Sequence, residues 1–125
     1  MIDEMALIEG VRRLVQRYRE LEQERERIYE EMAKLRPLRG CLEYYYVYNK
    51  VGKKYWYWRL VYREGDRLVK VHLGKEIPER LLRMRGDRAK LRMYKRRLKE
   101  IERELKNLER MIKIVENVCL SIGEV

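Results

Sequence analysis

The first third of the chain repeats apolar side chains at alternating steps of three and four residues. Over residues 3–36 this repeat is interrupted once, by Arg25. The spacing is typical of a long helix whose apolar seam packs against another helix in a coiled coil. Asp3 is the expected N-cap, and Pro37 with Gly40 should end the helix. The expected seam consists of Leu7, Val11, Leu14, Tyr18, Leu21, Ile28, Met32 and Leu35.

A second stretch with the same spacing continues almost to the last residue. It predicts a helix over residues 78–119, and Pro78 favours the start because proline suits the first helical position. Gly86-Asp87 leaves open whether this helix is continuous, is kinked, or is split so that a short first helix precedes the long one. Its expected seam consists of Leu91, Tyr94, Leu98, Ile101, Leu105, Leu108, Ile112, Val115, Cys119 and Ile122.

Between these helices the apolar period changes to two. Seven of the ten tyrosines and both tryptophans lie here. Dense aromatic and β-branched side chains with this period predict strands, at residues 42–49, 54–63 and 67–74. The two reversals between them each contain a glycine, so the three strands should form an antiparallel meander.

These elements predict an α+β fold in a single domain, residues 1–125. The helices at 3–36 and 78–119 would form an antiparallel two-helix coiled-coil stalk, with the meander of residues 42–74 inserted between them and a kink at 86–87 left open. Alternation along the second strand places Trp56, Trp58, Leu60 and Tyr62 on one face, which is the expected core face. The faces of the first strand stay unassigned because it is aromatic on both sides.

Positive charge is concentrated in the middle of the chain. The net charge is +10, and residues 80–99 alone contain ten basic residues and one acidic residue. Such a run repels itself unless an anion binds it, so it predicts a phosphate-binding surface. The expected nucleic-acid-binding residues are Lys50, Lys53, Lys54, Tyr55, Tyr57, Arg59, Arg67, Lys70, His72, Arg80, Arg83, Arg85, Arg88, Lys90 and Arg92.

This surface predicts a non-enzymatic nucleic-acid-binding protein. Duplex DNA is favoured, because cations on the second helix would flank a sheet inserted into the major groove. Aromatic sheets also stack single-stranded bases, so single strands and RNA, including ribosomal RNA, stay open. The alternative is a coiled-coil adaptor or structural protein whose basic part binds an acidic protein partner.

Each helix also has a second apolar stripe beside its seam. In an antiparallel hairpin both stripes lie at the end away from the sheet, where two copies could bury them in a four-helix bundle. The sequence therefore predicts a homodimer. The alternative is a wider seam within one hairpin. The expected interface residues are Ile8, Val15, Met111, Ile114 and Val118.

The residue types that catalysis requires are sparse. The chain has one histidine, His72, no glycine-rich phosphate loop and no Ser/His/Asp set. Cys41 and Cys119 lack metal-site spacing and are expected to be buried thiols. No catalytic residue, metal, cofactor or small-molecule substrate is therefore expected.

Charged residues make up 42% of the chain, and threonine is absent. Richness in Glu, Lys and Arg is typical of hyperthermophiles, so a thermophilic, archaeal source is expected. No apolar run is long enough to span a membrane, and the first ten residues, MIDEMALIEG, are acidic where a signal peptide is basic. A cytoplasmic location is expected, nucleoid-associated if the protein binds DNA.

The order of a charged helix, PLRGCLEYYYVY, GKKYWYWRLVYREGDRLVKVHLGK and a second charged helix resembles an uncharacterised prokaryotic family of short proteins. Some of its members are encoded near transposases. Many carry a cysteine cluster in the first hairpin, which reads YNKVGKK here, so the resemblance implies no metal. It covers about residues 20–110. Residues 43–74 also resemble the three-stranded arm-binding domain of phage integrases, which implies binding in the DNA major groove.

Overall fold

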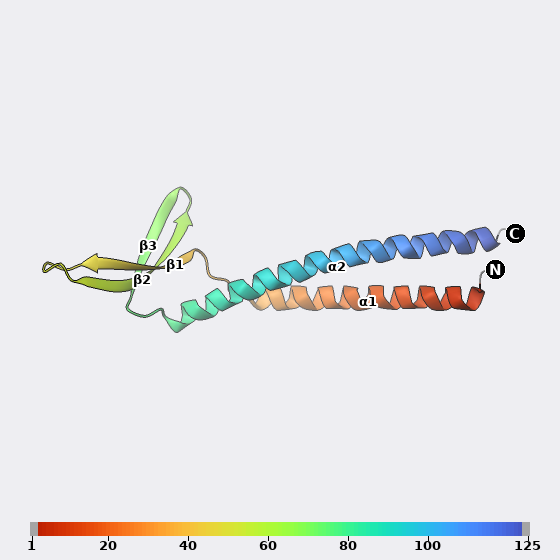
Figure 1. The fold of residues 1–125 in the computed structure, drawn as a ribbon, viewed down its shortest axis with the longest axis horizontal. Helices are drawn as coiled ribbons and strands as arrows, with labels where there is room; N and C mark the ends of the chain where they lie inside the picture. The colour runs from red at the N-terminus through yellow and green to blue at the C-terminus, as the bar shows by residue number, and fades with distance from the viewer. Residues whose placement is uncertain (1–2, 124–125) are drawn as a thin grey trace. The chain divides into compact units, whose positions relative to one another are not determined.

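The computed structural model describes residues 3–123 and contains two helices and three strands. Their order is α1 (Glu4–Lys34), β1 (Cys41–Tyr48), β2 (Lys54–Glu64), β3 (Arg67–Gly74) and α2 (Glu79–Gly123) (Figure 1). The three strands form one antiparallel sheet in the order β1-β2-β3. The α+β class, with a three-stranded meander between two helices in the chain, is therefore confirmed. Knobs-into-holes packing of the helices stays a prediction.

The chain divides into two compact units, each described by itself below. Met1–Lys34 and Met93–Val125 form the two-helix unit, and Leu35–Arg92 form the sheet-bearing unit. The single domain over residues 1–125 stays a prediction. Helix α2 contributes residues to both units.

The helix ends follow local chemistry. Asp3 is the N-cap of α1, because its Oδ1 accepts hydrogen bonds from the backbone N–H groups of Met5 and Ala6 at 3.0 and 3.4 Å. Helix α1 ends at Lys34, two residues earlier than predicted, because a residue that precedes a proline disfavours helical geometry. Helix α2 begins directly after Pro78, whose carbonyl accepts from the N–H of Leu82 at 3.2 Å.

Helix α2 is continuous through Gly86 and Asp87. A single glycine in a helix costs about 1 kcal/mol, which the rest of a 45-residue helix tolerates. The carboxylate of Asp87 accepts a hydrogen bond from the backbone N–H of Arg36 at 2.9 Å, so it does not compete with the helix backbone. The question left open by the sequence is answered in favour of an unbroken helix.

The core of the two-helix unit lies in its middle. Leu21 and Ile101 have no exposed surface. Cross-helix contacts pair Arg17 with Glu104 and Glu24 with Arg97, so the helices run antiparallel. The other buried members of the cluster are Ile28, Leu98, Leu105 and Leu108, with Leu14, Tyr18, Met32 and Tyr94 packed around them. All of these residues belong to the two predicted seams, so the seams are confirmed in the middle of the unit.

Arg25, which interrupts the seam of α1, is half-buried. Its Nη2 lies 4.0 Å from an Oε of Glu22 on the same helix. The predicted seam residue Ile122 lies within α2, but its side chain is outside the described part of the chain.

Strand β2 is the centre of the sheet and joins two hairpins that diverge from one another (Figure 1). Its residues 54–61 pair with β1, whereas its residues 58–64 pair with β3. Three strands therefore lie side by side only over residues 58–61, where a register shift between Trp58 and Arg59 bends the ladder. Before Trp58, β1 and β2 form a two-stranded ribbon.

The predicted core face of the sheet is not a core. Every residue of the three strands is at least partly exposed, and Trp56 is 43% exposed. The reason is geometric: a two-stranded ribbon has no packed layer on either face. The prediction that Trp56 is buried is therefore wrong, although Trp58, Leu60 and Tyr62 are partly covered.

The prediction that the two cysteines are buried is also wrong. Cys41 and Cys119 are both exposed free thiols, not buried ones. Cys41 is the first residue of an edge strand, and Cys119 lies in the last turns of α2, beyond the buried cluster. Neither place offers a second layer to cover the sulfur.

The segment of residues 35–40 joins the sheet to the first turns of α2 inside the sheet-bearing unit. Leu38 is 4% exposed, and its N–H donates to the carbonyl of Met84 at 2.9 Å. Arg88 donates to the carbonyls of Leu38 and Gly40. Gly40 has a φ of +92°, and a Cβ added there would clash with the carbonyl oxygen of Val61. This close approach requires glycine.

Within the described residues, no helix is both long and apolar enough to cross a membrane.

Candidate nucleic-acid interface

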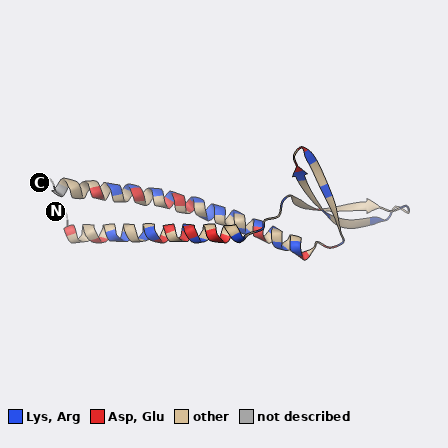
Figure 2. Ribbon diagram, turned by 180° about the vertical axis from the view of Figure 1, so that it is seen from behind, with Lys and Arg blue, Asp and Glu red and all other residues tan. Residues whose placement is uncertain are grey.

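All of the excess positive charge belongs to the sheet-bearing unit. Its residues include 16 basic and 6 acidic side chains, whereas the two-helix unit has 15 of each. Figure 2 shows blue and red mixed along α1 and the later part of α2, whereas the sheet is mostly tan and carries more blue than red. An anionic ligand would therefore be attracted to the sheet-bearing unit.

Several cations of the two-helix unit are neutralised by its own carboxylates. Arg97 forms two hydrogen bonds of 2.8 Å with Glu24, and these lower the pKa of that carboxyl and raise the pKa of the guanidinium. Arg17 bonds Glu104 at 3.0 and 3.3 Å, which raises the pKa of Arg17. Tyr18 donates to Glu109 at 2.8 Å, which raises the tyrosine pKa.

The sheet-bearing unit has few such pairs. Among its described residues two ion pairs form, Arg59 with Glu43 at 2.7 Å and Arg83 with Glu79 at 3.8 Å. The pair of Arg83 with Glu79 is highly exposed, and such surface ion pairs contribute little to stability. Most cations of this unit are therefore available to a ligand.

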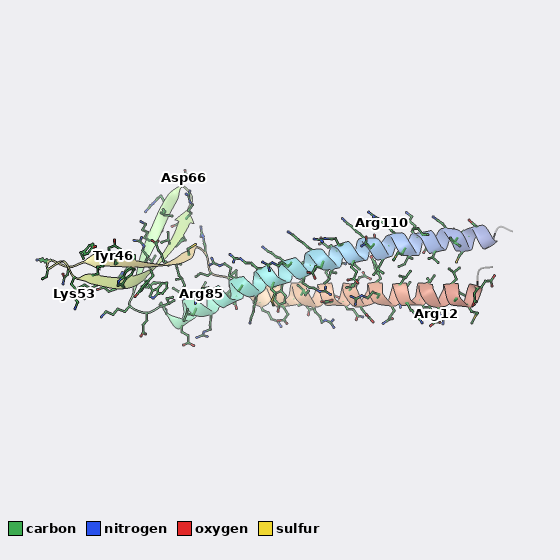
Figure 3. The ribbon with its side chains drawn as sticks, viewed as in Figure 1. Arg12, Tyr46, Lys53, Asp66, Arg85 and Arg110 are labelled. Carbon is green, nitrogen blue, oxygen red and sulfur yellow. The ribbon has the colours of Figure 1, made fainter. Side chains whose placement is uncertain are left out.

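The predicted lysines of the first hairpin lie in and beside the turn between β1 and β2, where Figure 3 labels Lys53. Lys50, Lys53 and Lys54 are all exposed. The side chain of Asn49 holds the turn, because its Oδ1 accepts from the N–H groups of Val51 and Lys53 at 3.0 and 2.9 Å. All three lysines were predicted from the sequence, and the fold gathers them at one end of the ribbon.

Four aromatic side chains that were not among the predicted site residues form an exposed surface on this ribbon. The register pairs Tyr44 with Trp58, Tyr46 with Trp56 and Tyr48 with Lys54, so these side chains share one face. Four of them are about half exposed, and we name these four the aromatic platform: Tyr44 (50%), Tyr46 (46%), Tyr48 (55%) and Trp56 (43%).

The opposite face carries the predicted basic aromatic set. Arg59 pairs with His72, and Val61 pairs with Lys70, so these residues share a face with Tyr55 and Tyr57 as predicted. The centre of this face, however, is bonded internally. Arg59 binds Glu43 and lies 4.4 Å from the ring centroid of Tyr45, whose hydroxyl is hydrogen-bonded to Nδ1 of His72.

The predicted cations outside the ribbon fall into two groups. Arg67 and Lys70 on β3 are exposed, as are Arg80, Arg83, Arg85, Lys90 and Arg92 on α2. Arg88 is half-buried and is occupied by the carbonyls of Leu38 and Gly40. It holds the fold rather than offering a free cation.

Arg80 and Arg83 line a surface hollow together with Arg36, Met84 and Asp87. Arg36 was not predicted from the sequence, because it belongs to the segment between helix and sheet and only the fold brings it to α2. Three arginines at one hollow suit an anionic group such as a phosphate.

Among the described residues, no three His, Cys, Asp or Glu side chains are grouped closely enough to hold a metal ion.

No protein-family model matches the chain, and neither a curated protein nor a solved structure proved significantly similar to it. The resemblances drawn from the sequence therefore stay predictions.

Proposed function

We propose that this chain is a non-enzymatic nucleic-acid-binding protein that contacts phosphates through its sheet-bearing unit. The supporting observation is the confinement of the net charge of +10 to this unit, with most of its cations exposed and without an internal carboxylate partner in the described structure. Exposed Lys and Arg release counterions when they bind phosphates, which drives association with any nucleic acid.

In this proposal two regions of the sheet-bearing unit contact phosphates. One is the lysine-bearing end of the β1–β2 ribbon, and the other is the arginine-lined hollow at the start of α2. A two-stranded ribbon is also narrow enough for the major groove of duplex DNA, which is the mode expected from the sequence. Duplex DNA therefore stays a candidate ligand.

The test is fluorescence anisotropy of labelled single-stranded DNA, duplex DNA and duplex RNA with the whole protein across a salt series. Replacing Arg80, Arg83 and Arg85 by glutamine should weaken binding and reduce the salt slope by about 0.7–0.9 for each phosphate that the variant no longer neutralises. The matched control replaces Arg27, Arg103 and Arg110 by glutamine, three exposed arginines of the two-helix unit, of which Arg110 is labelled in Figure 3. This control removes the same charge and should bind almost as the unmodified protein does.

Equal reductions of affinity in the two triple variants would show that total charge, not this surface, attracts the ligand. No binding to any of the three nucleic acids at low salt would overturn the proposal and favour the adaptor alternative.

A further inference from the structure

The rings of the aromatic platform form a continuous series along one face of the ribbon. Centroids of neighbouring rings are 5.3 Å apart for Tyr48 and Tyr46, 5.2 Å for Tyr46 and Trp56, and 5.0 Å for Trp56 and Tyr44. Tyr44 and Trp56 are stacked with an interplanar angle of 20°. The rings thus support one another across the strands, while about half of each residue stays open to solvent.

Positive charge accompanies these rings without negative charge. Residues 44–58 contain three lysines and no acidic residue. The Lys54 ammonium lies 4.6 Å from the ring centroid of Tyr46 and 5.7 Å from that of Tyr48. The nearest acidic residue in the strand, Glu43, alternates to the opposite face, where it is bound to Arg59.

We propose that the aromatic platform stacks unpaired nucleobases, while Lys50, Lys53 and Lys54 contact the phosphates of the same strand. This rests on the proposed function and names its ligand as a single-stranded nucleic acid. Base stacking on aromatic side chains is tolerant of sequence, because every base has a planar π face. Flanking lysines complete the combination of stacking surface and cationic track that single-strand-binding surfaces use.

Charge and ring chemistry together select this ligand over others. In a duplex the base faces are already stacked and only base edges are accessible, so the duplex would leave the platform unused. An acidic protein segment would pair with the lysines but would not need four adjacent rings. An anionic membrane surface also attracts lysine and tryptophan, and it is included as an outcome of the test.

The experiment compares two single strands with the same number of phosphates, one of normal nucleotides and one of abasic sites, each labelled for anisotropy. The unmodified protein should bind the normal strand at least about tenfold more tightly, since one stacked base supplies roughly that factor. The comparison uses the same folded protein for both ligands. It therefore isolates the bases from the phosphates.

Two variants assign the effect to the platform. Tyr46→Leu combined with Trp56→Leu should abolish the preference for the normal strand and leave abasic binding nearly unchanged. The control is Tyr29→Leu, which removes a tyrosine of equal exposure (51%) on α1 and should keep the full preference. Circular dichroism of each variant checks that the sheet is retained.

The outcomes separate this inference from the proposed function. Equal, salt-dependent affinity for normal and abasic strands would overturn base stacking and leave phosphate binding intact. No affinity for either strand would overturn both. Vesicles of anionic phospholipid that shift the tryptophan emission, when neither strand does so, would assign the platform to a membrane surface and overturn the inference.

Discussion

The guanidinium of Arg59 is bound to the carboxylate of Glu43 across the β1–β2 pair, with Nη2 and Oε1 2.7 Å apart. The hydrogen bond lowers the pKa of Glu43 and raises that of Arg59. Arg59 also lies over the ring of Tyr45, with its carbon Cζ 4.4 Å from the ring centroid. The sequence predicts that Arg59 contacts the nucleic acid. In the structure its side chain instead joins two strands.

This relationship predicts that Arg59→Gln affects folding more than binding. Tryptophan fluorescence during urea unfolding should show a lower stability of the sheet at pH 7, while anisotropy should show an affinity for single-stranded DNA close to that of the unmodified protein. Because the folded pKa of Glu43 is depressed, the pair stabilises the protein above the unfolded pKa, about 4.3. That contribution is lost as pH falls through the folded pKa.

Lys54→Gln is the matched comparison, since it also removes one cation from β2 and leaves the Glu43 pair in place. It should weaken binding and change stability little. A decrease of affinity in Arg59→Gln as large as that in Lys54→Gln would show that Arg59 reaches the ligand.

Gly40→Ala should destabilise the sheet-bearing unit more than Gly52→Ala. Both glycines have positive φ, +92° and +83°, so alanine costs about 1–2 kcal/mol of backbone strain at either site. Only at Gly40 would the new Cβ meet other atoms, the carbonyl oxygen of Val61 and, at 2.7 Å, Cβ of Tyr62. This overpacking should add about 1–3 kcal/mol. Urea unfolding followed by tryptophan fluorescence measures the free energy of unfolding of each variant. Equal destabilisation by the two substitutions would contradict the close approach of Gly40 to Val61.

Periodicity alone was enough to predict the elements and their order. The helix seams contain the buried positions Leu21, Ile28, Leu98 and Ile101, because a buried stripe on a helix has to recur at every turn. Asp3 and Pro78 predict the first residue of each helix to within one position, because the start of a helix depends on nearby backbone groups alone. These features are short-range, so the sequence displays them directly.

Which side chains share a face of the sheet depends on the register between strands, and the sequence does not show this register directly. A two-residue period assigns faces within one strand, but the register between strands decides which faces coincide. The pairing of Tyr48 with Lys54 centres the turn on Val51, and a shift of one residue would have moved Tyr44, Tyr46 and Tyr48 to the other face. The prediction that Trp56 is buried fails for a related reason. A sequence argument places a large apolar ring in the core because of its residue type, whereas its exposure depends on how many strands lie beside its own strand.

The ion pair between Glu24 and Arg97 should make the stability of the two-helix unit depend on pH. The carboxyl pKa is lowered chiefly by the hydrogen bonds from Arg97, so the pair stabilises the protein above the unfolded pKa of about 4.3 and loses this effect as pH falls through the folded value. Both side chains are about one-third exposed, so Glu24→Gln should cost only about 0.5–1 kcal/mol at pH 7. Below the folded pKa the variant and the unmodified protein should be equally stable.

Circular dichroism at the helix band, recorded during urea unfolding at pH 7 and at a series of lower pH values that starts at the unfolded carboxyl pKa of about 4.3, measures how the difference between the two proteins decreases. Glu26→Gln is the control, because Glu26 is exposed on the same helix and forms no ion pair among the described residues. A decrease of stability in Glu24→Gln that stays the same at every pH of the series would show that packing, not the charge pair, is responsible.

The apolar stripes beside the two seams are exposed, which supports a proposal that two copies of the chain associate through them. Ile8 is 47% exposed, Met111 52% and Ile114 62%, whereas Val15 and Val118 are half-buried. Val11, Val115 and Leu120 line a surface hollow beside them. Exposed apolar side chains from both helices suit burial in a four-helix bundle.

Sedimentation equilibrium of the unmodified protein should therefore give the mass of a dimer, about twice 15.6 kDa. Met111→Glu combined with Ile114→Glu should shift the equilibrium to the monomer, because two copies would then place unpaired carboxylates in an apolar interface. The control changes Lys106 and Lys113 to glutamate, which adds negative charge at exposed positions of the same helix and should leave the dimer intact. A monomer at all concentrations for the unmodified protein would contradict the proposal and assign the stripes to a widened seam within one hairpin.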